Sequence, residues 1–387
     1  MQTPAAVPQH PVPPPPTVYT PETLASFALA LNDLKRRVQE QIGAEDVRDM
    51  RRLRRIALVT EAAGRLMIHF CFEPVLFSLG VVVLWIAKQI SVIEIGHTVL
   101  HGTYDGMPDA QDLHSDRYRW PAPIHEASWK YAHNVRHHGA TNITGLDGDI
   151  HFGTVRLTQY TPYQKHHAIQ VPLTLLLLFP AFGFWMNAHV TGLVDLYLGN
   201  GRANGMDFLP DRSKQTRRAV WKKALSKYLP YYGKEFVLFP LLAWTQWPKV
   251  LLANFLAETL TAAYSAATIY CGHTGNEVAS WPENTRPRGR GQWYAMQVEA
   301  SQNFQVPRPL SILCGALDHQ IEHHLFPTFP PKRLRQIAPE VRAICEAHGV
   351  PYKIDTWPRT LAKVFRHLFR LSRETPGPAS GTVLGPR

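Results

Sequence analysis

The sequence predicts an all-α integral membrane protein, with about four transmembrane helices and a histidine-rich cap on the cytosolic side. Apolar residues of the 387-residue chain are concentrated in three stretches, 56–100, 168–198 and 235–272, although the mean hydropathy of the whole chain is −0.18. Polar sequence rich in arginine and histidine separates these stretches. Eight of the nineteen histidines fall into three clusters beside apolar sequence. The pattern indicates polar chemistry placed at the edge of a bilayer.

The basic character of the chain indicates a lipid surface. The net charge is +11, and cationic runs flank the apolar segments, as at Arg51, Arg52, Arg54 and Arg55 before the first one. A basic excess suits either nucleic acid or anionic lipid, but this placement predicts a bilayer as partner and no nucleic acid. The four cysteines are scattered without a CxxC pair. Their distribution argues against a disulfide framework or a thiolate zinc site.

Composition predicts one membrane domain, residues 22–371, between two disordered ends. Residues 1–21 are rich in proline, and residues 372–387 are rich in Gly, Pro, Ser and Thr. Such segments lack the apolar residues that a packed core requires. Residues 22–55 carry helical apolar spacing among many charges. We therefore expect amphipathic, interfacial helices there.

Residues 56–100 are predicted to form the first transmembrane hairpin. A crossing needs about 20 apolar residues, so two crossings fit only tightly, near 56–78 and 80–100. The first of them would contain three charged residues, Glu61, Arg65 and Glu73. A single long crossing is the competing interpretation.

Residues 235–272 are predicted to form a second hairpin, which breaks at Trp247-Pro248 because proline interrupts a helix. If all three histidine clusters serve one site, they must lie on one side of the membrane. The chain between the second and third clusters must then cross an even number of times. Residues 168–198, interrupted by Pro172 and Pro180, are therefore predicted to be interfacial or re-entrant.

Three segments are predicted to be cytosolic: the loop 101–167, the basic segment 199–234 and the cap 273–371. The basic segment supports this orientation, because short cytoplasmic loops carry an excess of Lys and Arg. The prediction places the histidines and both termini in the cytoplasm, on a protein integral to the cell (inner) membrane.

The histidine spacing predicts a metal site. His97 and His101 are four residues apart, so on a helix they lie on one face. Imidazole nitrogen is a common ligand for Fe, Zn, Cu and Ni. Eight clustered imidazoles exceed the four ligands of one tetrahedral ion, so we expect two metal ions. Thr98 occupies the position of the general-base glutamate of an HExxH zinc protease, which excludes that class.

The second and third clusters extend this pattern. His133 and His137 repeat the four-residue spacing, and His138 is adjacent. The third cluster ends in His323 and His324. His319 and Gln320 precede this pair, and spacing alone leaves both open as ligands. His273, at the end of the second hairpin, is a candidate for an additional ligand.

Carboxylates near the clusters are predicted to orient the imidazole rings, because a carboxylate that accepts from one ring nitrogen fixes the tautomer. Glu94 lies three residues before His97 and is expected to accept from it. The other candidates for this role are Asp147, Asp149, Asp318 and Glu322, with His319 if it is not a ligand. Isolated histidines are expected to be ordinary core or surface residues: His69, His114, His125, His151, His166, His167, His189 and His367.

Four segments carry a resemblance to the integral-membrane fatty acid desaturase and hydroxylase superfamily, and above all to its acyl desaturases. They are Glu94–Gly102, His133–Asn142, Cys271–His273 and Gln320–Pro327. The resemblance covers about residues 90–360. It implies a four-helix membrane domain under a cytosolic cap, a non-haem di-iron centre and O2 as co-substrate.

The resemblance also implies the ligand set. Carried over by position, the ligands are His97, His101, His133, His137, His138, His273, His323 and His324, and Gln320 is favoured slightly over His319. No catalytic residue beyond these ligands is implied.

The implied activity is the introduction of a double bond into a fatty acyl chain carried by CoA or by a lipid. The chain has no haem-binding His-Pro-Gly-Gly motif, so electrons are expected from a separate protein, a ferredoxin with its reductase. An apolar tunnel would hold the acyl chain. Phe255, Tyr264, Ala266 and Ala267 are candidates for its lining, with ordinary helix packing as the alternative.

Two other functions stay open. The first is a membrane di-iron hydroxylase that acts on an alkane, a fatty acyl chain or a carotenoid, because the same metal site can insert oxygen. The second is a haem-binding membrane electron carrier with paired axial histidines, which would leave most of the clustered histidines unexplained.

Overall fold

The computed structural model describes residues 18–150, 155–198 and 209–373, and this part of the chain is almost entirely helical. Its only sheet is a parallel pair of three-residue strands, β1 (Asn303–Gln305) and β2 (Ile354–Thr356). The all-α prediction is confirmed. The disorder predicted for the two ends falls almost wholly outside the described residues, as does His151.

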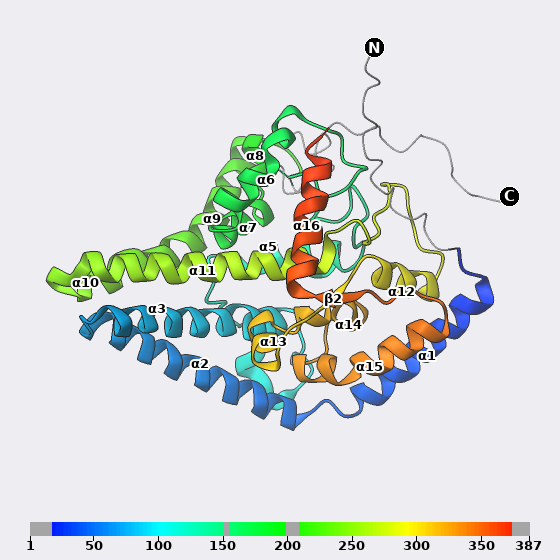
Figure 1. Ribbon diagram of the computed structural model, residues 1–387, viewed down its shortest axis with the longest axis horizontal. Helices are drawn as coiled ribbons and strands as arrows, with labels where there is room; N and C mark the ends of the chain where they lie inside the picture. The colour runs from blue at the N-terminus through cyan, green and yellow to red at the C-terminus, as the bar shows by residue number, and fades with distance from the viewer. Residues whose placement is uncertain (1–17, 151–154, 199–208, 374–387) are drawn as a thin grey trace, which may run out of the picture.

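Long helices project from one side of a compact helical cap (Figure 1). The first hairpin pairs α2 (Ala44–Phe70) with α3 (Pro74–Gln89), and α3 continues through the π-helix η1 (Ile90–His97) into α4 (Thr98–Leu100). Two glycines let α2 and α3 approach closely. A Cβ on Gly64 would lie 2.7 Å from the backbone nitrogen of Leu84, and one on Gly80 would lie 2.9 Å from Met67.

The second hairpin has a longer first arm than the sequence predicts. This arm runs through α9 (Lys214–Gly233), η6 (Lys234–Leu238) and α10 (Phe239–Leu242) without a break, so the basic segment and the apolar segment share one helix. After the short helix η7 (Trp244–Gln246), α11 (Trp247–His273) returns along α3 toward the cap. Pro248 lies in the first turn of α11, where proline is tolerated.

Two helices of the described chain are long and apolar enough to cross a membrane, Pro74–Leu100 and Trp244–His273. The 27 residues of the first span about 40 Å at the rise of an α-helix. Lys165–Leu178 and Phe182–Val190 form a third candidate only if the pair counts as one span, and it is bent by 110°. By length and composition, two or three helices of the described chain could thus span a membrane, and four spans remain a prediction.

The bent pair and the helices beside it cover one side of α11 (Figure 1). They are η4 (Lys165–Ile169), α6 (Gln170–Leu173), η5 (Thr174–Leu178), α7 (Phe182–Val190) and α8 (Leu193–Leu198). The segment between the hairpins also holds η2 (Pro108–Leu113), α5 (Glu126–Lys130) and the π-helix η3 (Tyr131–His137).

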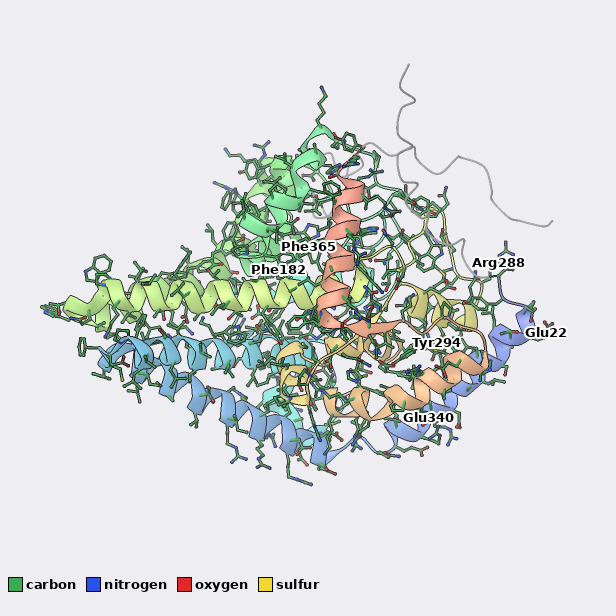
Figure 2. The ribbon with its side chains drawn as sticks, in the orientation of Figure 1. Glu22, Phe182, Arg288, Tyr294, Glu340 and Phe365 are labelled. Carbon is green, nitrogen blue, oxygen red and sulfur yellow. The ribbon has the colours of Figure 1, made fainter. Side chains whose placement is uncertain are left out.

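The cap consists of α1 and the chain after α11. Its helices are α1 (Pro21–Gln39), α12 (Arg290–Glu299), α13 (Arg308–Cys314), η8 (Leu317–His319), α14 (Gln320–Leu325), α15 (Pro331–Ala347) and α16 (Trp357–Leu371). The apolar stripe of α1, including Phe27 and Leu31, is fully buried against this cap. Tyr294 of α12 donates to Asn32 of α1 at 2.8 Å (Figure 2). The stripe expected to face a membrane surface therefore packs on protein.

Candidate metal centre

Histidines from four elements meet where the long helices enter the cap: the α3–η1–α4 helix, η3, α11 and α14. The α3–η1–α4 helix brings His97 and His101 to its last turns, and their Nε2 atoms lie 3.2 Å apart. His133 from η3 and His323 from α14 complete a first group, whose four candidate ligand atoms all lie within 4.8 Å of one another. All four side chains are buried.

A second group lies beside the first. It consists of His137 from η3, His273 at the end of α11 and His324 from α14. The Nε2 atoms of His137 and His273 are 3.2 Å apart, and the side-chain amide of Gln320 lies 2.6 Å from His273 Nε2. Each of these two adjacent groups could hold one metal ion.

His138 lies between the two groups. Its ring stacks on His324 with 4.3 Å between centroids, and it is 4.8 Å from the rings of His101, His133 and His323. With His323 and His324 it forms a third, overlapping set of candidate ligands. The eight histidines and Gln320 predicted from the sequence are thus brought together in one buried cluster.

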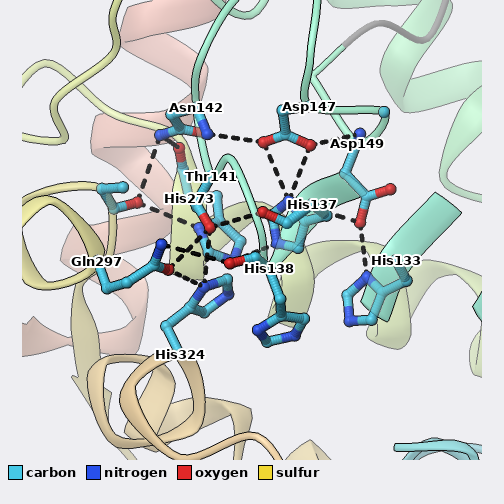
Figure 3. A network of polar contacts seen from close by, with 12 residues as sticks. His133, His137, His138, Thr141, Asn142, Asp147, Asp149, His273, Gln297 and His324 are labelled. Atoms are coloured by element: carbon cyan, nitrogen blue, oxygen red, sulfur yellow. Dashed lines mark hydrogen bonds and ion pairs between the residues drawn. The ribbon is translucent and has the colours of Figure 1, made fainter. Parts of the chain in front are cut away.

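Two carboxylates orient the second histidine cluster, as the sequence predicts (Figure 3). Asp147 accepts from Nδ1 of His137 at 2.9 Å, and Asp149 accepts from Nδ1 of His133 at 2.8 Å. Asp147 is itself held by the backbone amides of Asn142 and Asp149, at 2.7 and 2.8 Å. Each contact leaves Nε2 of the histidine free to face the other rings.

Other rings are oriented by groups that the sequence analysis missed. Nδ1 of His324 lies 2.9 Å from Oε1 of Gln297 on α12, and Nδ1 of His273 donates to the carbonyl of Ala300 at 3.1 Å. Thr141 donates to the same oxygen of Gln297 at 2.9 Å (Figure 3). Thr141 lies within the segment that carries the resemblance, whereas Gln297 is marked by no motif.

The prediction that Glu94 accepts a hydrogen bond from His97 was wrong. Both of its carboxylate oxygens accept from Arg335 on α15, at 2.8 Å each, instead of from His97. The helix places Glu94 on the side of η1 that packs against the cap, and a buried carboxylate is stabilised far more by a guanidinium than by a neutral ring.

The carboxylates of the third cluster also bond elsewhere. Glu322 accepts from Asn303 at 2.8 Å and from Tyr352 at 2.9 Å, so it ties α14 to β1 and to the segment before β2 within the cap. Asp318 pairs with His319 at 3.1 Å, and His319 belongs to none of the groups of candidate ligands among the described residues. Of the two candidates left open by spacing, Gln320 lies beside another candidate ligand, His273.

The electrostatics favour neutral imidazoles, which is the form that binds metal. Burial, followed by the neighbouring imidazoles, lowers the pKa of each of five histidines well below its ordinary value: His101, His133, His138, His323 and His324. Burial also opposes protonation of His137, but the carboxylates of Asp147 and Asp149 outweigh it and raise its pKa to about 9.

Several ring nitrogens inside the cluster have no hydrogen-bond partner. Among the described residues these buried orphan atoms are Nε2 of His133, both nitrogens of His138, Nε2 of His323 and His324, and Oε1 of Gln320. Buried polar atoms are nearly always bonded, and five unpaired nitrogens in one cluster would be costly. A metal ion can bind one nitrogen of each neutral ring, so ions in the cluster would satisfy Nε2 of His133, His323 and His324 and one nitrogen of His138. The residues present therefore fit a metal centre.

Four of the isolated histidines make ordinary hydrogen bonds, as expected. His69 bonds the carbonyls of Arg65 and Phe239, His189 lies 2.8 Å from the carbonyl of Gly148, and His367 bonds Asn276 and Leu157. His125 caps α5 by accepting from the amide of Ser128. None of these four belongs to a group of candidate metal ligands in the described chain.

An apolar cavity opens from the histidine cluster. His97, His133, His137, His273 and Gln320 line one end of it. Most of its walls are apolar: Val92, Ile93, Trp120, Ala122, Ile124, Trp129, Phe182 (Figure 2), Met186, Ala262, Ile269 and Leu317.

The four residues of α11 that were candidates for a tunnel lining do not line this cavity: Phe255, Tyr264, Ala266 and Ala267. The face of α11 that lines the cavity carries Glu258, Thr261, Ala262, Ser265 and Ile269. Phe255 is 57% exposed on another face, and Tyr264 packs against Trp85 and Trp357. The apolar sequence of α11 is nearly uniform, so periodicity did not distinguish its faces.

Residues 72–356 match the fatty acid desaturase family. The chain belongs to that family. The NADPH-dependent stearoyl-CoA 9-desaturase of Mycobacterium tuberculosis (strain ATCC 25618 / H37Rv) is 30% identical over 358 residues, which cover 91% of this chain and 81% of the relative.

Two further relatives show the breadth of the family. The sn-1 linoleoyl-lipid 6-desaturase of Synechocystis is 29% identical over 315 residues, which cover 77% of this chain and 82% of the relative. Fatty acid desaturase 3 of Bos taurus is 26% identical over 252 residues, which cover 62% of this chain and 49% of the relative. Every segment that carries the resemblance lies within the matched range.

Proposed function

We propose that this protein is a membrane fatty acid desaturase, which introduces a double bond into an acyl chain with O2 as oxidant. The observation that carries the proposal is the apolar cavity that ends on the buried histidine cluster. A saturated acyl chain has no polar group near its middle, so only the shape of an apolar cavity can hold it in place.

Two iron ions would occupy the histidine cluster and supply the activation of O2 and the oxidising power, which no side chain here provides. His97, His101, His133 and His323 would hold one ion. His137, His273, His324 and Gln320 would hold the other, with His138 between them. Asp147 and Asp149 keep the Nδ1 protons of His137 and His133 in place, which leaves Nε2 free to ligate.

The side chains of the protein would position the acyl chain and exclude water from the cavity. Trp129 stacks on His133 with 4.4 Å between ring centroids, and Trp120 packs against Trp129 at 5.1 Å. Both indoles line the cavity and are almost fully buried. They would press adjacent methylene groups of the acyl chain toward the histidine end while keeping bulk water out.

The relatives support the substrate class. One is named for stearoyl-CoA and one for a linoleoyl lipid, so we propose an acyl-CoA or an acyl-lipid as substrate. The name of the mycobacterial relative also supports NADPH as the origin of the electrons. We propose that a separate ferredoxin-type donor with its reductase delivers them. Arg217, Arg218, Lys222 and Lys223, exposed along α9, would attract an acidic donor of this kind.

The same proposal places the enzyme in the cell (inner) membrane, with the histidine cluster and both termini in the cytoplasm. The two hairpins would supply four crossings, α2 with α3 and the α9–α10 arm with α11. The two hairpin turns lie at the same end of the molecule, away from the cap, which supports this topology (Figure 1).

Expression in a host that lacks the activity, followed by mass spectrometry of its total fatty acids, tests the function. We expect a new unsaturated species that disappears with His323→Ala and persists with the matched control His114→Ala, outside the cluster. A hydroxylated product in its place would establish the runner-up, a membrane hydroxylase. Unchanged lipids with the intact chain and its electron donor would contradict both.

A further inference from the structure

A network of ion pairs crosses the interior of the membrane helices. Arg65 of α2 contacts Glu61 at 2.7 Å and Glu235 of η6 at 2.9 Å. Lys88 of α3 contacts Glu235 and Glu258 of α11, at 3.2 Å each. The side chains of Lys88 and Glu235 are 7% and 1% exposed. Ionisable groups inside membrane helices are costly, and they commonly mark a functional position.

The network ends at the cavity that opens from the histidine cluster. The hydroxyl of Tyr231, on α9, donates to Glu258 at 2.6 Å and accepts from Lys88 at 3.2 Å. Tyr231 and Glu258 both line the cavity. The ring of Tyr231 is therefore held at its tip by a cation and an anion, so it cannot rotate away without breaking both contacts.

The distance between this network and the histidine cluster can be measured along α11, which lines the cavity. Glu258 is the cavity-lining residue of α11 farthest from His273. The two residues are fifteen positions apart, which corresponds to about 22 Å of helix. Thr261, Ala262, Ser265 and Ile269 line the cavity in between, so one face of α11 forms a continuous wall.

We propose that Tyr231 and Glu258, held by Lys88, form the floor of the acyl tunnel and set the longest acyl segment that fits beyond the reacting carbons. This rests on the proposed desaturase function. A methyl end that reached the floor would have to displace the held ring or lie against a charged carboxylate. Either step breaks buried polar contacts without replacing them, so chains that are too long bind poorly.

Acyl substrates of graded length test the floor from both directions. Tyr231→Ala removes the ring and deepens the tunnel, and we expect the ratio of kcat/KM for long over short chains to rise about tenfold, the effect of a misfit methylene in an apolar pocket. Ala262→Trp fills the tunnel one turn above Glu258, and we expect a shift of similar size toward shorter chains.

Tyr232→Ala is the matched control. Tyr232 is the adjacent tyrosine, stacks on Phe236 and does not line the cavity, so we expect the variant to keep the chain-length preference of the wild type.

Ala262→Trp does not alter any residue of the ion network, so it remains a test if Tyr231→Ala fails to fold. An active enzyme whose preference is unchanged in Ala262→Trp and in every folded Tyr231 variant would overturn the floor. A wild type without unsaturated product would instead overturn the proposed function.

Discussion

Glu94 and Arg335 form a two-point ion pair between the membrane helices and the cap. Each carboxylate oxygen of Glu94 lies 2.8 Å from a different guanidinium nitrogen of Arg335. Glu94 precedes His97 by three residues, whereas Arg335 lies 241 residues later in the chain on α15. Arg335 also donates to the carbonyl of Ser311 at 2.9 Å. The pair thus joins the helix that carries the first two histidines to the cap that carries the last two.

Arg335→Ala is expected to destabilise the protein and loosen the metal centre. Removing one partner of a buried ion pair leaves an uncompensated charge, which costs about 3 kcal/mol. Thermal unfolding and iron content of the purified protein measure the two effects. Arg342→Ala removes an exposed arginine of the same helix, paired with Glu346, and serves as control. Equal behaviour of the two variants would contradict a role of the pair at the centre.

Asp147→Asn is expected to weaken metal binding with little change in shape. The amide cannot replace the negative charge that fixes the Nδ1 proton of His137, and such losses cost about tenfold to hundredfold in metal affinity. Metal titration of the apoprotein measures the change. Asp109→Asn alters an exposed carboxylate outside the cluster and keeps the wild-type affinity. A wild-type affinity for Asp147→Asn as well would show that the contact is dispensable.

Gln320 and His319 can be separated by two single substitutions. Gln320→Ala removes the amide that lies 2.6 Å from His273. We expect this variant either to retain about half of the bound iron or to bind iron more weakly at the second group. His319→Ala removes a ring that pairs with Asp318 outside the groups of candidate ligands in the described chain, and we expect the iron content to stay at the wild-type level. The opposite result would make His319 the ligand.

Gly64→Ala is expected to separate α2 from α3. The added Cβ would lie 2.7 Å from the backbone nitrogen of Leu84, and backbone cannot yield as a flexible side chain can. Overpacking of this kind costs about 1–3 kcal/mol. Gly233→Ala meets nothing within 4 Å and is expected to leave stability unchanged or raised. Unfolding of both variants in detergent gives the comparison.

Single cysteines test the proposed topology. In a background without native cysteines, Thr245→Cys at the α10–α11 turn is expected to react with a membrane-impermeant thiol reagent from outside the cell membrane. Asp116→Cys, on the exposed segment before α5, is expected to react only after the membrane is opened. Labelling of both positions from the same side would contradict two transmembrane hairpins.

Much of the fold and of the site could be predicted from local sequence. Apolar length indicated the long helices, and the four-residue histidine spacing placed two rings on one helical face. The choice between one and two helices for residues 56–100 could not be made this way. It depended on Arg65, which pairs with Glu61 one turn earlier and also with the buried Glu235, 170 residues later in the chain.

Local sequence was enough to predict the candidate ligands: the clustered imidazoles, the carboxylates that follow the second cluster, and their place beside apolar helices. These are local properties, because they depend on residue type and on spacing of a few residues. The groups that support each ring follow from the folded arrangement of the chain. Gln297 reaches His324, Arg335 takes Glu94 away from His97, and Tyr231 meets Glu258 at the end of the cavity. Such contacts join distant parts of the chain, and their energies arise from burial that no single segment can create.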